Sequence, residues 1–335
     1  MTTPDYSFFP KWDPVPDEWF EAPIRPYSGK SEEHKQMLTE ELAILKAFYH
    51  GVMTAEEAAY AITRPISTSS IPVLNTYSDE CIALFMLWRQ IVNACEEWPA
   101  SRIPDLVALL SAISKIPDHI HRGEATDDED EGPLGWDILP YFAAEWRDAH
   151  WRIPMNILQD YPDTAARLRE RGLYIRAQEV ESQLVAAGIW DLWRAINYVI
   201  WALEMKPNHD YHAEERNGVH HHPLAFYSLE LDFQVPAVAC WIKHNGQRMH
   251  QCIARDGLKG NPDLPTVRMH FGEPIERWAF WKKRLLELAN DPDDFTRRGA
   301  QLAIGYMDEA TESLTEKLNA FDILLRPSAL DSQCL

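Results

Sequence analysis

The sequence predicts an all-α fold, with one large helical domain of about 10–13 helices behind an extended, proline-rich arm. Three observations lead to this prediction. Beyond residue 30, apolar side chains recur at helical spacing in one stretch after another. Proline, glycine and asparagine separate these stretches, as is typical of turns between helices. No run of alternating β-branched residues, which would predict strands, is found in the chain.

Residues 1–30 are predicted to form the arm, because closely spaced prolines disfavour both helix and sheet. These prolines are Pro4, Pro10, Pro14, Pro16, Pro23 and Pro26. Residues 31–330 are predicted to form the single helical domain. Loops inside that domain are expected near residues 121–135 and 207–222, where charged, glycine-containing stretches interrupt the helical pattern.

The first half of the domain contains four predicted helices. "SEEHKQMLTEELAILKAFYHG" has helical periodicity and ends at Gly51, and "TAEEAAYAIT" opens with Thr54 and Glu57, the pattern of a capping box. "SDECIALFMLWRQIVNACEEW" is apolar on most sides, which predicts a central position. "IPDLVALLSAISKI" follows it.

Six further helical stretches follow the acidic loop. They are "GWDILPYFAAEWRDAHW", "LYIRAQEVESQLVAAG", "WDLWRAINYVIWALEMK", "VPAVACWIKHNGQRMHQC", "PIERWAFWKKRLLELAN" and "FTRRGAQLAIGYMDEATESLTEKLNAFDILL". Their lengths and the turns between them favour one helical assembly over a chain of separate domains.

Charge and composition narrow the classes of partner. The 335 residues have a net charge of −20, and 46% of them are hydrophobic. So acidic a surface repels phosphate backbones, and we expect no nucleic-acid partner. The 5 cysteines are scattered without a CxxC pair, which is typical of reduced thiols in the cytoplasm. We find no signal sequence and no apolar run of about 18 residues, so we expect no membrane span. We expect a monomer or homodimer.

Three motifs suggest metal chemistry but have simpler explanations. Asp127, Asp128 and Glu131 fit an Asp-Asp-x-x-acid pattern, but adjacent carboxylates repel one another and favour a solvated loop. The "DPDD" of Asp291–Asp294 lies between two predicted helices, where aspartates end and cap helices. His220–His222 lie in a polar loop, and adjacent side chains point in different directions, which does not suit a zinc site.

Two helical stretches combine carboxylates with apolar surroundings. Glu145 and Asp148 are three residues apart and share a helical face, where they could bind one cation beside Arg147; the alternative is an exposed, salt-bridged stripe. Glu204 ends an otherwise apolar helix that carries Trp201. There it needs a partner or a metal, unless it marks the point where the helix emerges into solvent.

The stretch "ERWAFWKKRLLEL" places Ala279 and Lys283 four residues apart, on one face of a predicted helix. Trp278 and Trp281 lie along another side. A small residue one turn from a lysine could form a pocket floor with a cationic rim. The alternative is an amphipathic helix whose lysines are solvated.

Three segments, "GWDILPYFAAEWRDAHW", "VPAVACWIKHNGQRMH" and "ERWAFWKKRLLELA", resemble the signature blocks of an all-helical ascomycete family. Most of its members have no assigned role. A subset are atypical terpene cyclases, including humulene synthases of tropolone-sesquiterpenoid pathways. The resemblance covers roughly residues 35 to 320 and implies a fungal enzyme of secondary metabolism, a lyase that acts on farnesyl diphosphate with Mg²⁺.

In these cyclases an essential lysine lies one helical turn after a residue that controls product geometry, which corresponds to Lys283 and Ala279. Two departures affect the assignment. Alanine stands where the cyclases have a larger apolar residue, and Lys282 adjoins Lys283, so the register can shift by one. The resemblance supplies no magnesium ligands, and we take Glu145, Asp148 and Glu204 as candidates from the sequence.

In this interpretation arginines assist the diphosphate, and aromatic rings stabilise the allylic cation by roughly 0.5–2 kcal/mol each. The candidates are Arg277, Arg147, Trp201, Trp241, Trp278 and Phe280. The alternative hypothesis is a non-catalytic helical regulatory or scaffold protein, which would explain the acidic surface and the proline-rich arm.

Overall fold

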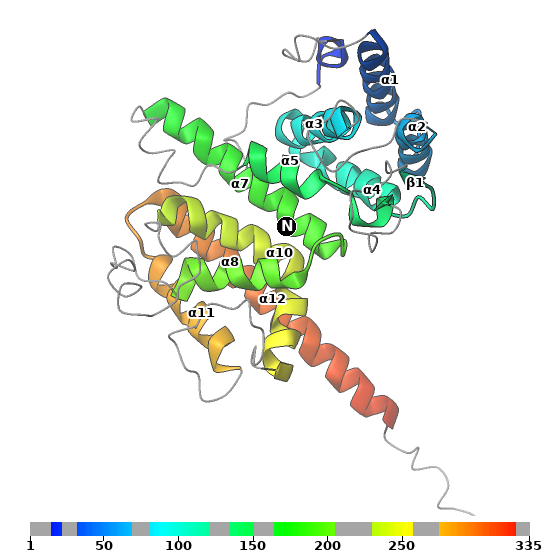
Figure 1. The fold of residues 1–335 in the computed structure, drawn as a ribbon. Coiled ribbons are helices and arrows are strands. Elements are labelled where there is room, and N and C mark those ends of the chain that lie inside the picture. The colour runs from blue at the N-terminus through cyan, green and yellow to red at the C-terminus, as the bar shows by residue number, and fades with distance from the viewer. Residues whose placement is uncertain are drawn as a thin grey trace, which may run out of the picture. The chain divides into compact units, whose positions relative to one another are not determined.

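The computed structural model describes residues 15–21, 32–68, 81–120, 134–150, 164–204, 230–256 and 275–325. This part of the chain is almost entirely helical, which confirms the predicted all-α fold class (Figure 1). The chain divides into two compact units, Met1–Ile189 and Trp190–Leu335.

In unit 1 most described residues are helical, and α3 lies at the centre. The helix α3 contacts α1, α2, α4, α5 and α7, and its Leu84, Trp88 and Ile91 are completely buried. The predicted central position is therefore confirmed. The elements are η1 Asp17–Phe20, α1 Glu32–Tyr49, α2 Ala55–Ser67, α3 Cys81–Glu97, η2 Ala100–Arg102, α4 Ile103–Ile113, β1 His119–Ile120, β2 Leu134–Gly135, η3 Trp136–Ile138, α5 Phe142–Ala149 and α7 Thr164–Ala186.

Local signals in the sequence set the boundary between α1 and α2. Gly51, just past the end of α1, has a φ of +70°, a left-handed conformation that suits glycine. The predicted capping box is confirmed: the Glu57 N–H donates to Thr54 Oγ1 at 3.2 Å, and the Thr54 N–H donates to Glu57 Oε2 at 2.9 Å. Together they end one helix and start the next.

Within the predicted arm, Asp17–Phe20 form a short 3-10 helix rather than extended backbone. The two-residue strands β1 and β2 pair antiparallel, with His119 opposite Gly135. The sequence did not predict this ladder, because two residues are too few to show alternation.

A strained turn leads into α5. Leu139 and Tyr141, on either side of Pro140, both have a left-handed backbone, with φ values of 45° and 66°. Such conformations cost of order 1–3 kcal/mol each outside glycine. The indole N–H of Trp88, on α3, donates to the Pro140 carbonyl at 2.6 Å within the core. The central helix therefore holds the turn that positions α5.

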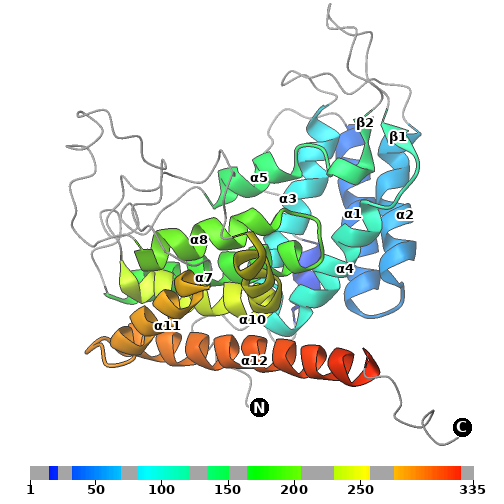
Figure 2. The same cartoon turned by 90° about the horizontal axis from the view of Figure 1, so that it is seen from below.

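In unit 2 four helices are described: α8 Leu192–Glu204, α10 Leu231–Asp256, α11 Glu276–Leu288 and α12 Asp294–Leu325. The helix α10 contacts the other three, and α12 lies along α10 and α11 (Figure 2). At Gly299 of α12, an added Cβ would lie 2.6 Å from the backbone nitrogen of Pro236 in α10. The two helices therefore approach closely because this position has no side chain.

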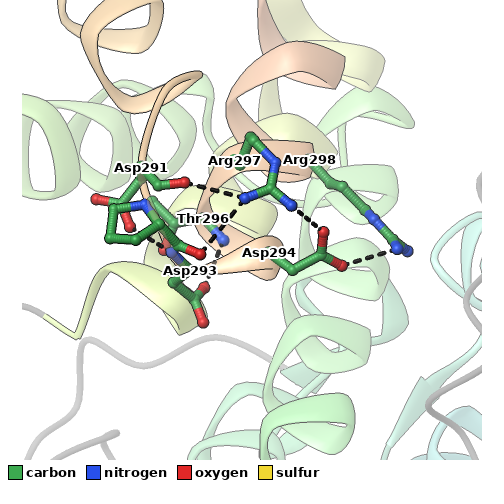
Figure 3. Close-up of polar contacts among 7 residues, drawn as sticks. Asp291, Asp293, Asp294, Thr296, Arg297 and Arg298 are labelled. Atoms are coloured by element: carbon green, nitrogen blue, oxygen red, sulfur yellow. Dashed lines mark hydrogen bonds and ion pairs between the residues drawn. The ribbon is translucent and has the colours of Figure 1, made fainter.

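The start of α12 confirms the capping interpretation of the "DPDD" motif (Figure 3). Asp293 Oδ1 accepts from the Thr296 N–H at 2.8 Å, and Asp291 Oδ1 accepts from the Asp293 N–H at 2.9 Å. Asp294 forms ion pairs with Arg297 and with Arg298, the latter at 2.8 Å. These carboxylates start a helix, and their acceptor positions serve backbone N–H groups and arginines.

Candidate functional site

A charged cluster with buried side chains joins α8 to α11 in unit 2. Glu204 is the last residue of α8, and its side chain is only 2% exposed. Its Oε1 accepts from Arg277 Nε at 2.9 Å and from Trp281 Nε1 at 2.7 Å, and its Oε2 accepts from Arg277 Nη2 at 3.4 Å. Both donors lie on α11, one helical turn apart. The Glu204 carboxylate therefore has protein partners, one of the two possibilities that its apolar helix suggested.

Burial controls the electrostatics of this cluster. Desolvation raises the pKa of the Glu204 carboxyl above its usual range, while Arg277 and the hydrogen bond from Trp281 act in the opposite direction. A carboxylate that takes two bonds from one guanidinium and one from an indole is held in a fixed orientation. The three side chains therefore form a hydrogen-bonded charged cluster that is largely shielded from water.

Aromatic rings of unit 2 gather on α8, α10 and α11. Tyr198 lies 5.5 Å from Trp201 and 5.7 Å from Trp241, measured between ring centroids. Trp278 lies 5.0 Å from the ring of His250. The candidate residues Trp201, Trp241 and Trp278 are all buried, whereas Phe280 is half-buried. Trp201 Nε1 is buried without a hydrogen-bond partner among the described residues.

Sequence reasoning missed two members of this region. Trp281 was placed on the apolar side of its helix but not recognised as a donor, although it stands four residues after Arg277 and so shares its face. His250 is part of no sequence motif that would mark it as a functional residue. Burial lowers its pKa, and its Nδ1 is buried without a partner among the described residues. Only the fold brings it to Trp278.

The carboxylate Glu145 in unit 1 is also buried and paired. It lies on α5 with 6% of its side chain exposed, and it forms an ion pair with Arg89 of α3. Desolvation is the main cause that raises its pKa; Arg89 lowers it and Asp148 raises it further. Asp148 is 62% exposed and lies 3.7 Å from Arg147, which is 75% exposed. Glu145 and Asp148 therefore share a helix but occupy different environments.

Ala279 and Lys283 lie on the exposed side of α11, opposite the buried Arg277 and Trp281. The adjacent Lys282 is half-buried and bonds to Asp308 of α12. The two possible registers of the essential lysine therefore correspond to different environments. Lys283 is exposed, whereas Lys282 forms an ion pair with Asp308 of the neighbouring helix α12.

Other predicted features lie outside the described residues. They are the acidic run with Asp127, Asp128 and Glu131, and the histidines His220–His222. In the part of the chain that is described, no group of three or more His, Cys, Asp or Glu side chains is arranged to hold a metal ion. Nor is any described helix both long and apolar enough to traverse a lipid bilayer.

Comparison with known proteins gives one match. No curated protein and no solved structure matches the chain. A family model described as "Protein of unknown function (DUF3632)" matches residues 88–285, more than half of the chain. The match spans most of α3 through most of α11, including both buried glutamate–arginine pairs. It agrees with the resemblance to a family whose members mostly have no assigned role. The chain therefore belongs to this family of proteins of unknown function, DUF3632.

Proposed function

We propose that the protein is an atypical class I-type terpene cyclase that ionises and cyclises farnesyl diphosphate to a humulene-like sesquiterpene. It would act in the cytoplasm, as a monomer or homodimer, with Mg²⁺. The resemblance of three segments to the signature blocks of a family that includes humulene synthases supports this proposal. The structural observation that carries it is the buried Glu204–Arg277–Trp281 cluster among the rings of unit 2. Desolvated charge is costly in a helical core and is common at functional sites.

In the proposed reaction the allylic C–O bond breaks and the diphosphate leaves with the bonding electrons. Arg277, whose Nε and Nη2 bind Glu204, would contribute the positive charge of its guanidinium to the site. Lys283, on the opposite face of α11, is the essential lysine that the resemblance implies. The carbocation then cyclises against aromatic faces such as Trp201, Trp241 and Trp278, and transfers a proton to the released pyrophosphate to give the hydrocarbon. Excluding water prevents quenching to an alcohol.

Magnesium, when bound, supplies charge neutralisation for the departing diphosphate. The Glu204 carboxylate has about four lone-pair positions, of which three accept the hydrogen bonds described, so it fits one coordination position. Magnesium commonly takes one or two protein carboxylates and completes its shell with phosphate oxygens and water. Glu145 and Asp148 remain candidates for the same role.

The decisive experiment is to incubate purified protein with farnesyl diphosphate and magnesium, with and without EDTA, and to analyse the headspace for hydrocarbons. We expect a sesquiterpene that disappears with EDTA. Lys283→Ala should abolish pyrophosphate release, whereas Lys282→Ala, the matched control, should retain it. The reverse result would shift the register by one residue. Full activity in both variants would remove the lysine from the mechanism.

A second candidate function is that of a non-catalytic helical regulatory or scaffold protein. The observation that favours it is that each buried candidate carboxylate already has an arginine partner, while Ala279 and Lys283 face outwards. Absence of any metal-dependent hydrocarbon from farnesyl diphosphate, in protein shown by circular dichroism to be folded, would favour this candidate.

A further inference from the structure

The short helix η1 is held on unit 1 by contacts typical of a bound peptide. Phe20 and Val15 are 5% and 3% exposed. The ring of Phe20 lies 5.7 Å from that of Tyr49 and 6.1 Å from that of Trp98. Trp19 is half-buried, and its ring lies 5.8 Å from that of Trp98. Two adjacent aromatic anchors therefore sit on an aromatic surface.

Polar contacts fix the register of this segment. The Val15 N–H donates to Tyr49 Oη at 3.0 Å, and Trp19 Nε1 donates to Glu97 Oε2 at 2.5 Å. At the outer edge, Lys46 Nζ lies 3.0 Å from Asp17 and 3.5 Å from Glu21. These exposed ion pairs contribute to selectivity and to the rate of association more than to affinity.

The surface under η1 is built by the ends of α1 and α3 and by the residue that follows each of them, His50 and Trp98. Arg102 of η2 donates to the Tyr49 carbonyl, and its guanidinium lies 4.9 Å from the centroid of the Tyr49 ring. Arg176 of α7 donates to the Trp98 carbonyl. Both aromatic residues are therefore positioned by elements other than η1. We call the residues that receive the segment the η1 site: Lys46, Tyr49, His50, Glu97 and Trp98.

One hydrogen-bond donor in the η1 site, the indole N–H of Trp98, has no acceptor on the segment Val15–Glu21. Trp98 is 1% exposed, and its indole Nε1 has no hydrogen-bond partner among the described residues. A buried donor without an acceptor weakens the complex that buries it. A ligand with the same aromatic anchors and an acceptor at this position would be a better match.

We propose that the η1 site is an interaction surface for a partner protein's short peptide that combines acidic residues with two adjacent aromatic anchors, and that Val15–Glu21 occupies it in cis as a competing ligand. The partner's chemistry follows from the site: Lys46 and His50 select acidic residues, and Tyr49 and Trp98 receive aromatic rings. Dissociation of the chain's own segment would expose the site. This inference does not depend on the proposed catalytic function.

The test uses the full-length protein and a fluorescent peptide with the sequence of residues 15–21, VPDEWFE. In the double variant Trp19→Ala/Phe20→Ala the chain's own anchors are removed, and we expect the peptide to bind it at least tenfold more tightly than the wild type, measured by anisotropy. A peptide with both aromatics replaced by alanine is the matched control and should not bind.

A charge exchange shows whether binding occurs at the η1 site. We call the Trp19→Ala/Phe20→Ala protein the vacated variant. Adding Lys46→Glu to it should weaken peptide binding several-fold, and a peptide carrying Asp17→Lys and Glu21→Lys should restore binding. If the vacated variant does not fold, the full-length variant Asp17→Lys/Glu21→Lys, which keeps both anchors, replaces it.

No peptide binding to a folded variant would overturn the proposal, as would binding that is insensitive to Lys46→Glu. A wild-type dimer that the peptide dissociates would assign the site to a second copy of this chain and would overturn the assignment to a different partner.

Discussion

Two glutamates with buried side chains, Glu145 in unit 1 and Glu204 in unit 2, are each paired with an arginine, but the two pairs differ in how enclosed they are. Both have a pKa raised mainly by desolvation, and both are opposed by an arginine. Arg89, the partner of Glu145, is 34% exposed, whereas Arg277, the partner of Glu204, is 7% exposed. Glu204 also has an indole donor. Glu204 therefore depends more strongly on its arginine than Glu145 does, because water has little access to its carboxylate and cannot take the place of Arg277.

The largest effect should come from breaking the enclosed pair. Arg277→Leu leaves the Glu204 carboxylate buried without its cation, and we expect the free energy of unfolding to fall by roughly 3–5 kcal/mol. Urea unfolding followed by tryptophan fluorescence measures this. The double variant Glu204→Leu/Arg277→Leu is the control and should lose much less. A loss below about 1 kcal/mol in the single variant would show that the pair is solvated.

A buried carboxyl group with no hydrogen-bond partner among the described residues extends the comparison. Glu41 is 1% exposed, neither of its oxygens has a hydrogen-bond partner among the described residues, and desolvation raises its pKa well above 4.5. Removing this unsatisfied group with Glu41→Met should raise the free energy of unfolding by about 1–3 kcal/mol.

The pH dependence of this gain has a definite sign. Because the carboxyl of Glu41 ionises at a higher pH in the folded than in the unfolded protein, its contribution favours folding below about pH 4.5. That contribution is lost as the pH rises towards the folded pKa. The advantage of Glu41→Met should therefore grow from about pH 5 to pH 8. A gain that is the same at both values would indicate that Glu41 has a partner.

The partly exposed pair should matter less. Arg89→Leu removes the cation beside Glu145, but water can reach the edge of this site, so we expect a loss of about 1–2 kcal/mol, smaller than for Arg277→Leu. The two variants should be compared in the same urea titrations. An equal or larger loss for Arg89→Leu would reverse the ranking of the two pairs.

The smallest effect is expected at Asp148. This carboxylate is 62% exposed, so Asp148→Asn should change the free energy of unfolding by less than about 0.5 kcal/mol. The same titration with and without magnesium tests its role as a ligand. A stabilisation by magnesium in the wild type that Asp148→Asn removes would show that Asp148 holds the ion.

Features governed by neighbouring residues were predictable from the sequence. Gly51 ends a helix, Thr54 with Glu57 starts one, and Asp293 caps α12, because each of these signals acts within a few residues. The apolar character of Cys81–Glu97 likewise predicted its central position in unit 1.

Partners distant in sequence were not predictable. Glu204 is paired with a residue 73 positions away, and no local pattern identifies that arginine. On α11 the periodicity defined two faces, but it could not show that Arg277 lies on the buried one and Lys283 on the exposed one. That depends on which neighbouring helix covers each face.

The sequence by itself determined that the chain is helical and where several helices start and end, since spacing of apolar residues and capping are local properties. Only the tertiary structure decided which charges are buried and what they bind. Burial and pairing depend on helices that are distant in the chain, and the free energy of a charged group depends on the water that those helices exclude.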